Sequence, residues 1–88
     1  MTSKVLMYCT AACPFCQAAE RLLVEKGVAI EKVRVDREPE RRTEMTQKAG
    51  GRRTVPQIWI GDRHVGGCDD LYELERKGEL DTLLKASA

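Results

Sequence analysis

The sequence predicts an α/β fold in which helices cover both faces of a four-stranded mixed sheet, in the order β-α-β-α-β-β-α. A strand–helix–strand unit over residues 5–35 predicts the parallel part of the sheet, since long crossovers join parallel strands and are nearly always right-handed. Two short apolar strands on either side of Gly61-Asp62 predict an antiparallel hairpin. Helical segments before and after this hairpin complete a three-layered arrangement.

The first half of the chain carries the clearest periodicity. Val5–Tyr8 is an almost continuous apolar run, which is typical of a strand buried on both faces. The following helix is expected to have one buried face, because its apolar residues recur at the i, i+3, i+4 spacing, at Phe15, Ala18, Ala19, Leu22 and Leu23. Gly27 fits the left-handed position that ends helices. An outer strand with one wet face follows, since apolar and charged residues alternate imperfectly around Ile30, Val33 and Val35.

The second half begins with a helix over Pro39–Ala49, whose apolar side is so thin that we expect it to lie on the surface. The hairpin strands are Gln57–Ile60 and Arg63–Val65. Asp69 is expected to cap a third helix. Gly78 interrupts this helix before a last apolar stripe, which is formed by Leu80, Leu83 and Leu84.

Length and composition exclude several classes of protein. The 88 residues suffice for one domain, residues 1–88. A net charge of +1 gives no indication of a nucleic-acid or anionic-membrane partner, and 42% hydrophobic with 33% charged residues is typical of a soluble globular protein. No apolar run reaches the length of a membrane span and no secretory signal follows Met1, so we expect a cytoplasmic protein. In a reducing compartment, four cysteines indicate catalysis or metal binding more than structural disulfides.

The motif Cys13-Pro14-Phe15-Cys16 lies between the first strand and the first helix, the position of a redox motif in an intracellular protein. Pro14 suits the first helical position, because its missing N–H would have no partner there. Cys13 then falls at or just before the N-cap, where free amides and the helix dipole favour a thiolate, the reactive form of cysteine. Cys16 lies about one turn further on the same side of the helix, from which it can close a small disulfide ring with Cys13.

Two further stretches follow the motif, Thr54-Val55-Pro56 and Gly66-Gly67-Cys68-Asp69-Asp70. Together with Cys13-Pro14-Phe15-Cys16 and Pro56-Gln57-Ile58-Trp59-Ile60-Gly61, they closely resemble a glutaredoxin of the small bacterial dithiol kind, over nearly the whole chain. The resemblance implies a thioredoxin fold. It also implies a glutathione-dependent oxidoreductase that reduces protein disulfides and glutathione mixed disulfides, with Cys13 as the nucleophile and Cys16 as the resolving thiol.

The resemblance also implies the partners. These are glutathione as the co-substrate, proteins with disulfides or glutathionylated cysteines and, indirectly, the glutathione reductase system. We expect a monomer without a metal, a nucleic acid or a membrane as a partner.

The glutathione site implied by the resemblance consists of Cys13, Phe15, Thr54, Val55, Pro56, Gly67, Cys68 and Asp69. Pro56 resembles the family's cis-proline, which would turn the Val55 backbone toward the cysteinyl part of glutathione, as an added strand does. Phe15 replaces the more common tyrosine and keeps an aromatic wall beside the thiol. The free amides at the start of the third helix would bind the γ-glutamyl carboxylate, and Asp69 would pair with the ammonium group.

Thr10 is the most consequential departure from the family pattern. Many relatives have a lysine here that reaches the glycine carboxylate of glutathione. Arg42, Arg52 or Arg53 could substitute for it, although a solvated surface is an equally good interpretation of this basic cluster.

Three other residues have modest expected roles. Cys9 is expected to be a small buried side chain, with a redox or metal role as the alternative. His64 is expected to be a surface residue, and Trp59 a packing residue on the same strand face as Gln57.

Two alternatives to the glutathione-dependent function remain open. The first is metal binding, either as an iron–sulfur cluster held by a dimer or as a zinc site at Cys9, Cys13, Cys16 and Cys68. Pro14 argues against the cluster, because cluster-binding relatives usually lack a proline there. The second is a protein reduced by thioredoxin reductase, although Ala12 differs from the tryptophan typical of thioredoxins.

Overall fold

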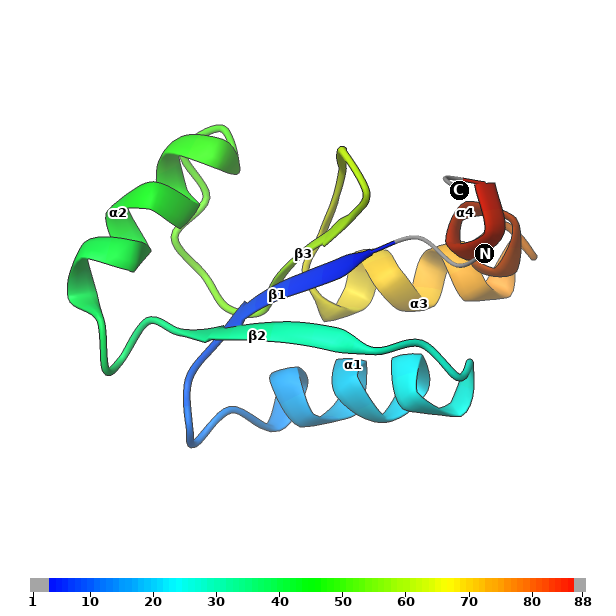
Figure 1. The fold of residues 1–88 in the computed structure, drawn as a ribbon, viewed down its shortest axis with the longest axis horizontal. Coiled ribbons are helices and arrows are strands. Elements are labelled where there is room, and N and C mark those ends of the chain that lie inside the picture. The colour runs from blue at the N-terminus through cyan, green and yellow to red at the C-terminus, as the bar shows by residue number, and fades with distance from the viewer. Residues whose placement is uncertain (1–3, 87–88) are drawn as a thin grey trace.

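Figure 1 shows the computed structural model, which describes residues 4–86. Residues 1–3 and 87–88 lie outside the described part. The first of these segments is where the sequence predicts that no secretory signal follows Met1. Among the described residues, no helix is long and apolar enough to cross a membrane. The elements follow one another as β1 (Val5–Cys9), α1 (Pro14–Glu25), β2 (Ile30–Arg34), α2 (Pro39–Lys48), β3 (Gln57–Ile60), β4 (Arg63–Gly66), α3 (Cys68–Arg76) and α4 (Leu80–Ala86).

The four strands form one mixed sheet in the order β2-β1-β3-β4, as the sequence predicts. β1 pairs in parallel with β2, and α1 is the crossover between them. β3 runs antiparallel to both β1 and β4. Gly61, with φ of +60°, adopts the left-handed conformation in the tight β3–β4 turn, a conformation that glycine adopts more readily than residues with a side chain.

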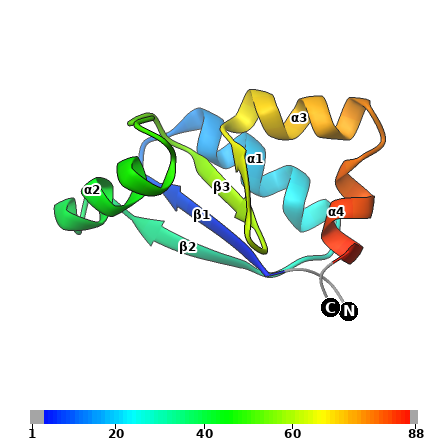
Figure 2. The ribbon, with the colours of Figure 1, turned by 90° about the horizontal axis from the view of Figure 1, so that it is seen from above.

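The alternation of side chains along β1 and β3 divides the interior into two cores. Val5 and Met7 of β1 and Ile58 of β3 point to the side of α1, α3 and α4. Tyr8 of β1 and Trp59 of β3 point to the other side, where they pack with Met45 of α2. The sheet is therefore the middle of three layers (Figures 1 and 2), which confirms the predicted arrangement.

The last predicted helix is two helices in the structure. α3 ends at Arg76, and Gly78 adopts a φ of +74° before α4 begins at Leu80. The left-handed conformation of Gly78 prevents α3 from continuing. Leu80 and Leu84 of α4 are buried in the core on the side of α1. The apolar stripe predicted from the sequence is real, but it belongs to a helix of its own.

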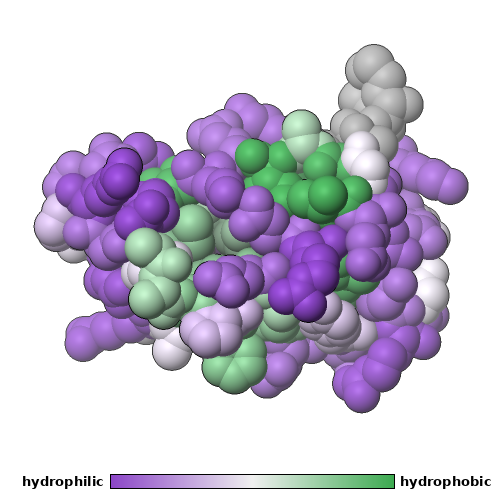
Figure 3. Space-filling model, turned by 90° about the horizontal axis from the view of Figure 1, so that it is seen from below, coloured by the Kyte–Doolittle hydropathy of each residue, from purple (hydrophilic) through white to green (hydrophobic). Residues whose placement is uncertain are grey.

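Few of the large apolar side chains in the described part of the chain are exposed. Figure 3 shows one face of the molecule, on which apolar side chains gather in separate areas with polar side chains between them. Among the described residues, the large apolar side chains that are exposed are Phe15, Val24 and Tyr72. Phe15 is predicted to belong to the buried stripe of α1, and this is wrong: its side chain faces solvent and the residue is 61% exposed, although Cys16 in the same turn is buried.

Candidate active site

Cys13 and Cys16 lie where β1 leads into α1. Cys13 is the N-cap of the helix and Pro14 its first residue, as the sequence predicts. The backbone N–H of Cys16 donates a hydrogen bond to Sγ of Cys13 over 3.0 Å. The two cysteines form a disulfide with a Cα–Cα distance of 5.1 Å. The first sulfur of the motif is therefore held at the positive end of the α1 dipole, where a thiolate would be stabilised after reduction.

The segment before β3 reaches the same place from the other side. The Val55–Pro56 peptide bond is cis, as predicted. Sγ of Cys13 lies 3.9 Å from the carbonyl oxygen of Val55. The backbone of this segment consequently lies directly beside the disulfide.

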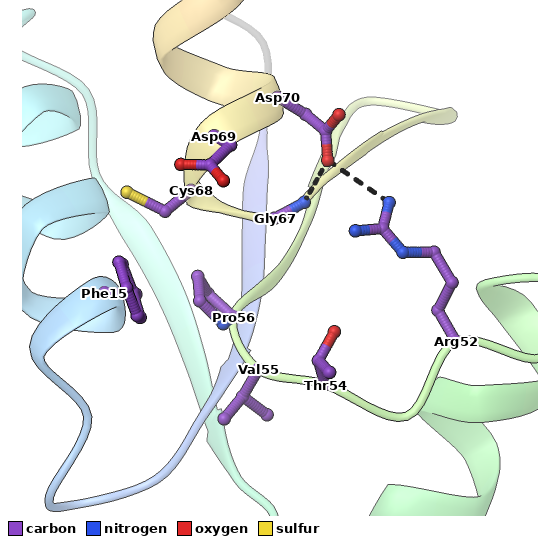
Figure 4. Close-up of a pocket in the computed structure, with 9 residues that line it drawn as sticks. All are labelled: Phe15, Arg52, Thr54, Val55, Pro56, Gly67, Cys68, Asp69 and Asp70. Atoms are coloured by element: carbon purple, nitrogen blue, oxygen red, sulfur yellow. Dashed lines mark hydrogen bonds and ion pairs between the residues drawn. The ribbon is translucent and has the colours of Figure 1, made fainter.

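A cleft of about 260 Å³ opens beside the motif (Figure 4). Three segments form it: the first turn of α1, the connection from α2 to β3, and the first turn of α3. It is lined by Phe15, Arg52, Thr54, Val55, Pro56, Gly67, Cys68, Asp69 and Asp70. The fold thus gathers around one cleft all of the predicted glutathione-site residues other than Cys13, which contacts Val55 at its edge.

The first turn of α3 is capped differently from the prediction. The N-cap is Gly67, and its N–H donates to Oδ2 of Asp70 over 2.8 Å. Nη1 of Arg52 donates to the same oxygen over 3.2 Å (dashed lines in Figure 4). The Gly67 N–H and the Arg52 guanidinium hold the pKa of Asp70 below its ordinary value. The prediction that Asp69 caps this helix is wrong: Asp69 is exposed and lines the cleft.

Arg52 and Asp70 are the two cleft residues that the predicted site lacks. Asp70 has a local signal, because an acidic residue at the third helical position can accept from the N-cap N–H in the manner of a capping box. Arg52 has no such local signal: its charge alone makes it one of three candidate cations, and its partner Asp70 lies eighteen positions away in the chain. Arg42, another candidate cation, does not line the cleft. Its Nη1 donates to the carbonyl oxygen of Arg53 over 3.0 Å.

Cys9 and Thr10 lie at a second cavity, of about 270 Å³, which they share with Cys16, Lys32 and Arg34 among others. Cys9 is buried, as predicted, and burial raises the pKa of its thiol. Thr10 does not line the cleft beside Phe15. The position at which the family resemblance leads us to expect a lysine therefore contributes no side chain to that cleft.

Cys68 and His64 complete the residues singled out from the sequence. Cys68 is buried at the cleft, and burial followed by the charge of Asp69 raises the pKa of its thiol. His64, predicted to be a surface residue, is half-buried instead: it stacks on Trp59 with ring centroids 4.5 Å apart. Trp59 is a packing residue, as predicted.

The cysteines do not gather into a metal site. Within residues 4–86, no group of three or more histidine, cysteine, aspartate or glutamate side chains is arranged to hold a metal ion. Cys13 and Cys16 are paired with each other, and Cys9 and Cys68 are free. No observation in the structure favours the metal-binding alternative.

A four-stranded mixed sheet with a Cys-x-x-Cys disulfide at the N-terminus of the first helix defines a thiol-disulfide oxidoreductase of the thioredoxin fold. The Glutaredoxin family model matches residues 5–65. The chain belongs to the glutaredoxin family.

Individual relatives agree with this assignment. A glutaredoxin of Pseudomonas aeruginosa is 56% identical over 82 residues, which are 93% of this chain and 96% of that protein. The solution structure of a glutaredoxin from Brucella melitensis is 46% identical and superposes with a TM-score of 0.85 over 99% of this chain and 94% of that one. The crystal structure of a buckwheat glutaredoxin–glutathione complex is 28% identical, with a TM-score of 0.88 over 96% of this chain and 78% of that one.

Proposed function

We propose that this oxidoreductase takes its electrons from glutathione and reduces protein disulfides and glutathione mixed disulfides. In the proposal, Cys13 is the nucleophile and Cys16 the resolving thiol. The proposal extends to a single domain over residues 1–88 that works as a monomer in the cytoplasm, with the glutathione reductase system regenerating glutathione.

Two routes follow from these roles. With a glutathionylated protein, the Cys13 thiolate attacks the glutathione sulfur and releases the protein thiolate. A glutathione thiolate then attacks this mixed disulfide, which gives oxidised glutathione and frees Cys13. With a protein disulfide, Cys13 forms a mixed disulfide with one protein sulfur and releases the other as a thiolate. Cys16 then displaces the first protein sulfur, and two glutathione molecules reduce the resulting Cys13–Cys16 disulfide. The first route consumes one free glutathione thiol, because the other half of the oxidised glutathione comes from the substrate, and the second route consumes two.

The surroundings of Cys13 support its role as the nucleophile. The Cys16 N–H, 3.0 Å from Sγ of Cys13, and the N-terminus of α1 both stabilise negative charge on this sulfur. A stabilised thiolate is present in a larger fraction at neutral pH and is also a better leaving group. Cys16 lies in the first turn of the helix and lacks this N-cap position.

The cleft beside Cys13 is the observation that carries the glutathione dependence. It adjoins the reactive sulfur at Val55, whose backbone we propose pairs with the extended cysteinyl part of glutathione. At its other side it meets the first turn of α3, where the backbone amides that follow the Gly67 N-cap are suited to a carboxylate. Phe15 supplies an apolar wall, and Asp69 an anion for an ammonium group.

Two further observations support glutathione as the ligand. The related buckwheat glutaredoxin was solved as a complex with glutathione. Arg52 lines the cleft of this chain and is the cation that we propose compensates for Thr10 in binding the second carboxylate of glutathione.

The test is the reduction of a glutathione mixed disulfide coupled to glutathione reductase and NADPH. We expect Cys13→Ser to be inactive, because it lacks the nucleophile, and Cys16→Ser to keep most of the activity, because the glutathione route does not use it. Cys9→Ser, which removes a free thiol outside this cleft, is the control for loss of a cysteine and should remain active. A wild-type protein that is inactive in this assay and is reduced by thioredoxin reductase would contradict the proposal.

A further inference from the structure

Gln57, the first residue of β3, is a completely buried amide side chain directly after Pro56. Amide side chains are seldom fully buried, because each unpaired polar atom would cost desolvation energy. Here both ends of the amide have partners. Nε2 donates to the carbonyl oxygen of Thr54 over 3.0 Å and to its Oγ1 over 3.3 Å, while Oε1 lies 2.7 Å from Nε2 of His64.

The directions of these hydrogen bonds follow from chemistry. The Thr54 carbonyl can only accept, so the amide nitrogen of Gln57 must face it. Oε1 then faces His64 and can only accept, so Nε2 of His64 must carry a proton. Stacking on Trp59 fixes the plane of the imidazole ring. The chain of donors runs in one direction, from His64 through Gln57 to Thr54.

This series of hydrogen bonds ends at Thr54, in the segment that forms one wall of the cleft. Thr54, Val55 and Pro56 all line the cleft, and the Val55 carbonyl lies beside Sγ of Cys13. Thr54 lies outside any helix or strand, so the pairing of β3 with β1, which begins at Gln57, does not hold it. The Gln57 amide ties the backbone and the hydroxyl of Thr54 to the first residue of the sheet.

We infer that Gln57, oriented by His64, is a positioning residue that sets the affinity for glutathione by fixing the Thr54-Val55-Pro56 wall of the cleft. The inference rests on the proposed glutathione-dependent function and adds two residues that contact neither the disulfide nor the cleft. Neither side chain exchanges protons or electrons with the substrate. Their effect should appear in KM for the glutathione mixed disulfide, while the reactivity of Cys13 stays the same.

The direct test replaces Gln57 by methionine, which has a similar volume and cannot donate to Thr54. We expect KM for a glutathione mixed disulfide to rise by about 3- to 10-fold, the effect of losing a neutral hydrogen bond. We expect kcat to change by less than about 2-fold, and the rate at which iodoacetamide alkylates Cys13 in the reduced protein to stay the same. Gln47→Met, the same change at an exposed position of α2, is the matched control and should leave all three quantities unchanged.

His64→Phe provides a second variant that keeps a ring to stack on Trp59 and removes the hydrogen bond to Gln57. We expect a smaller rise in KM than for Gln57→Met. We also expect the KM of the double variant to equal that of Gln57→Met, because the two residues act through one series of hydrogen bonds. Should Gln57→Met fail to fold, the His64→Phe value decides.

Three outcomes would overturn the inference. KM could be unchanged in the folded variants, or the two variants could have additive effects. Alternatively, kcat and the amount of alkylated Cys13 could fall together at constant KM, which indicates less folded protein. Each of these leaves the proposed function intact if the wild-type protein is active with glutathione, whereas an inactive wild type would remove both proposals.

Discussion

The two adjacent aspartates at the start of α3 differ in what their carboxylates contact. Asp70 accepts from the Gly67 N–H and from Arg52, so it fixes the beginning of the helix and the far wall of the cleft. Asp69 is exposed at the cleft. We therefore assign the stability of this helix start to Asp70 and the recognition of an ammonium group to Asp69.

This assignment predicts different effects for the two alanine variants. Asp70→Ala should lower the free energy of unfolding by about 1 kcal/mol, the usual effect of removing a capping side chain. Asp69→Ala, the matched control one position away, should change it by less than about 0.5 kcal/mol, as is usual at exposed sites. Urea unfolding of the two variants measures both values. Equal destabilisation would show that the hydrogen bond from the Gly67 N–H to Asp70 does not stabilise the start of α3.

The low pKa of Asp70 makes its contribution dependent on pH. The Gly67 N–H and Arg52 favour the ionised carboxylate in the folded protein, so the folded pKa lies below the unfolded value of about 3.9. A depressed pKa contributes stability that is fully present above the unfolded value and is lost as the pH falls through the folded value. The difference in unfolding free energy between wild type and Asp70→Ala should thus be constant from about pH 7 to pH 5 and shrink below about pH 4. A difference that grows on acidification would contradict this.

At the scale of elements, the junction between β4 and α3 leaves no room for a side chain at Gly66. Gly66 has a φ of +115°, which disfavours any residue with a side chain. A Cβ atom at this position would also collide with the Asp70 carboxylate and lie 2.8 Å from Nη1 of Arg52. Gly27, after α1, has a φ of +79° but open space around it.

Both glycines have a positive φ, so the pair compares an alanine in the crowded surroundings of Gly66 with one in the open space around Gly27. Gly27→Ala should lower the free energy of unfolding by about 1–2 kcal/mol, the cost of a left-handed conformation. Gly66→Ala should add a further ~1–3 kcal/mol, because the methyl group overpacks the Arg52–Asp70 pair. Chemical unfolding of both variants provides the comparison. If they lose the same free energy, the junction has more space than the structure indicates.

Elements with strong local signals could be predicted from the sequence. Pro14 and Gly27 bracket α1, and Gly61 marks the β3–β4 turn, because each residue type fits one backbone conformation. The helix start at Gly67 could not be predicted in this way, since the choice between Asp69 and Asp70 depends on how the chain leaves β4. The prediction that Phe15 is buried is wrong because helical periodicity does not show that this position of the apolar stripe faces an open cleft.

At the scale of the whole molecule, the fold brings three distant segments to one end of the sheet. β1, an inner strand, delivers the disulfide, the segment before β3 delivers Val55, and β4 leads into α3. The motifs and their order predict that these segments meet. The cleft between them, and the participation of Arg52 in it, depend on side-chain contacts between residues far apart in the chain, which a single sequence does not specify.

The central claim, that glutathione occupies this cleft while bound to Cys13, is tested most directly by NMR on a trapped mixed disulfide. Cys16→Ser, treated with oxidised glutathione, should form the adduct at Cys13 and keep it, because no resolving thiol is present. We predict that the largest amide shift changes between the free and glutathionylated protein fall on Thr54, Val55, Gly67, Cys68 and Asp69. Failure to form an adduct at Cys13, or shift changes confined to Cys9, Thr10 and Lys32 at the second cavity, would contradict the claim.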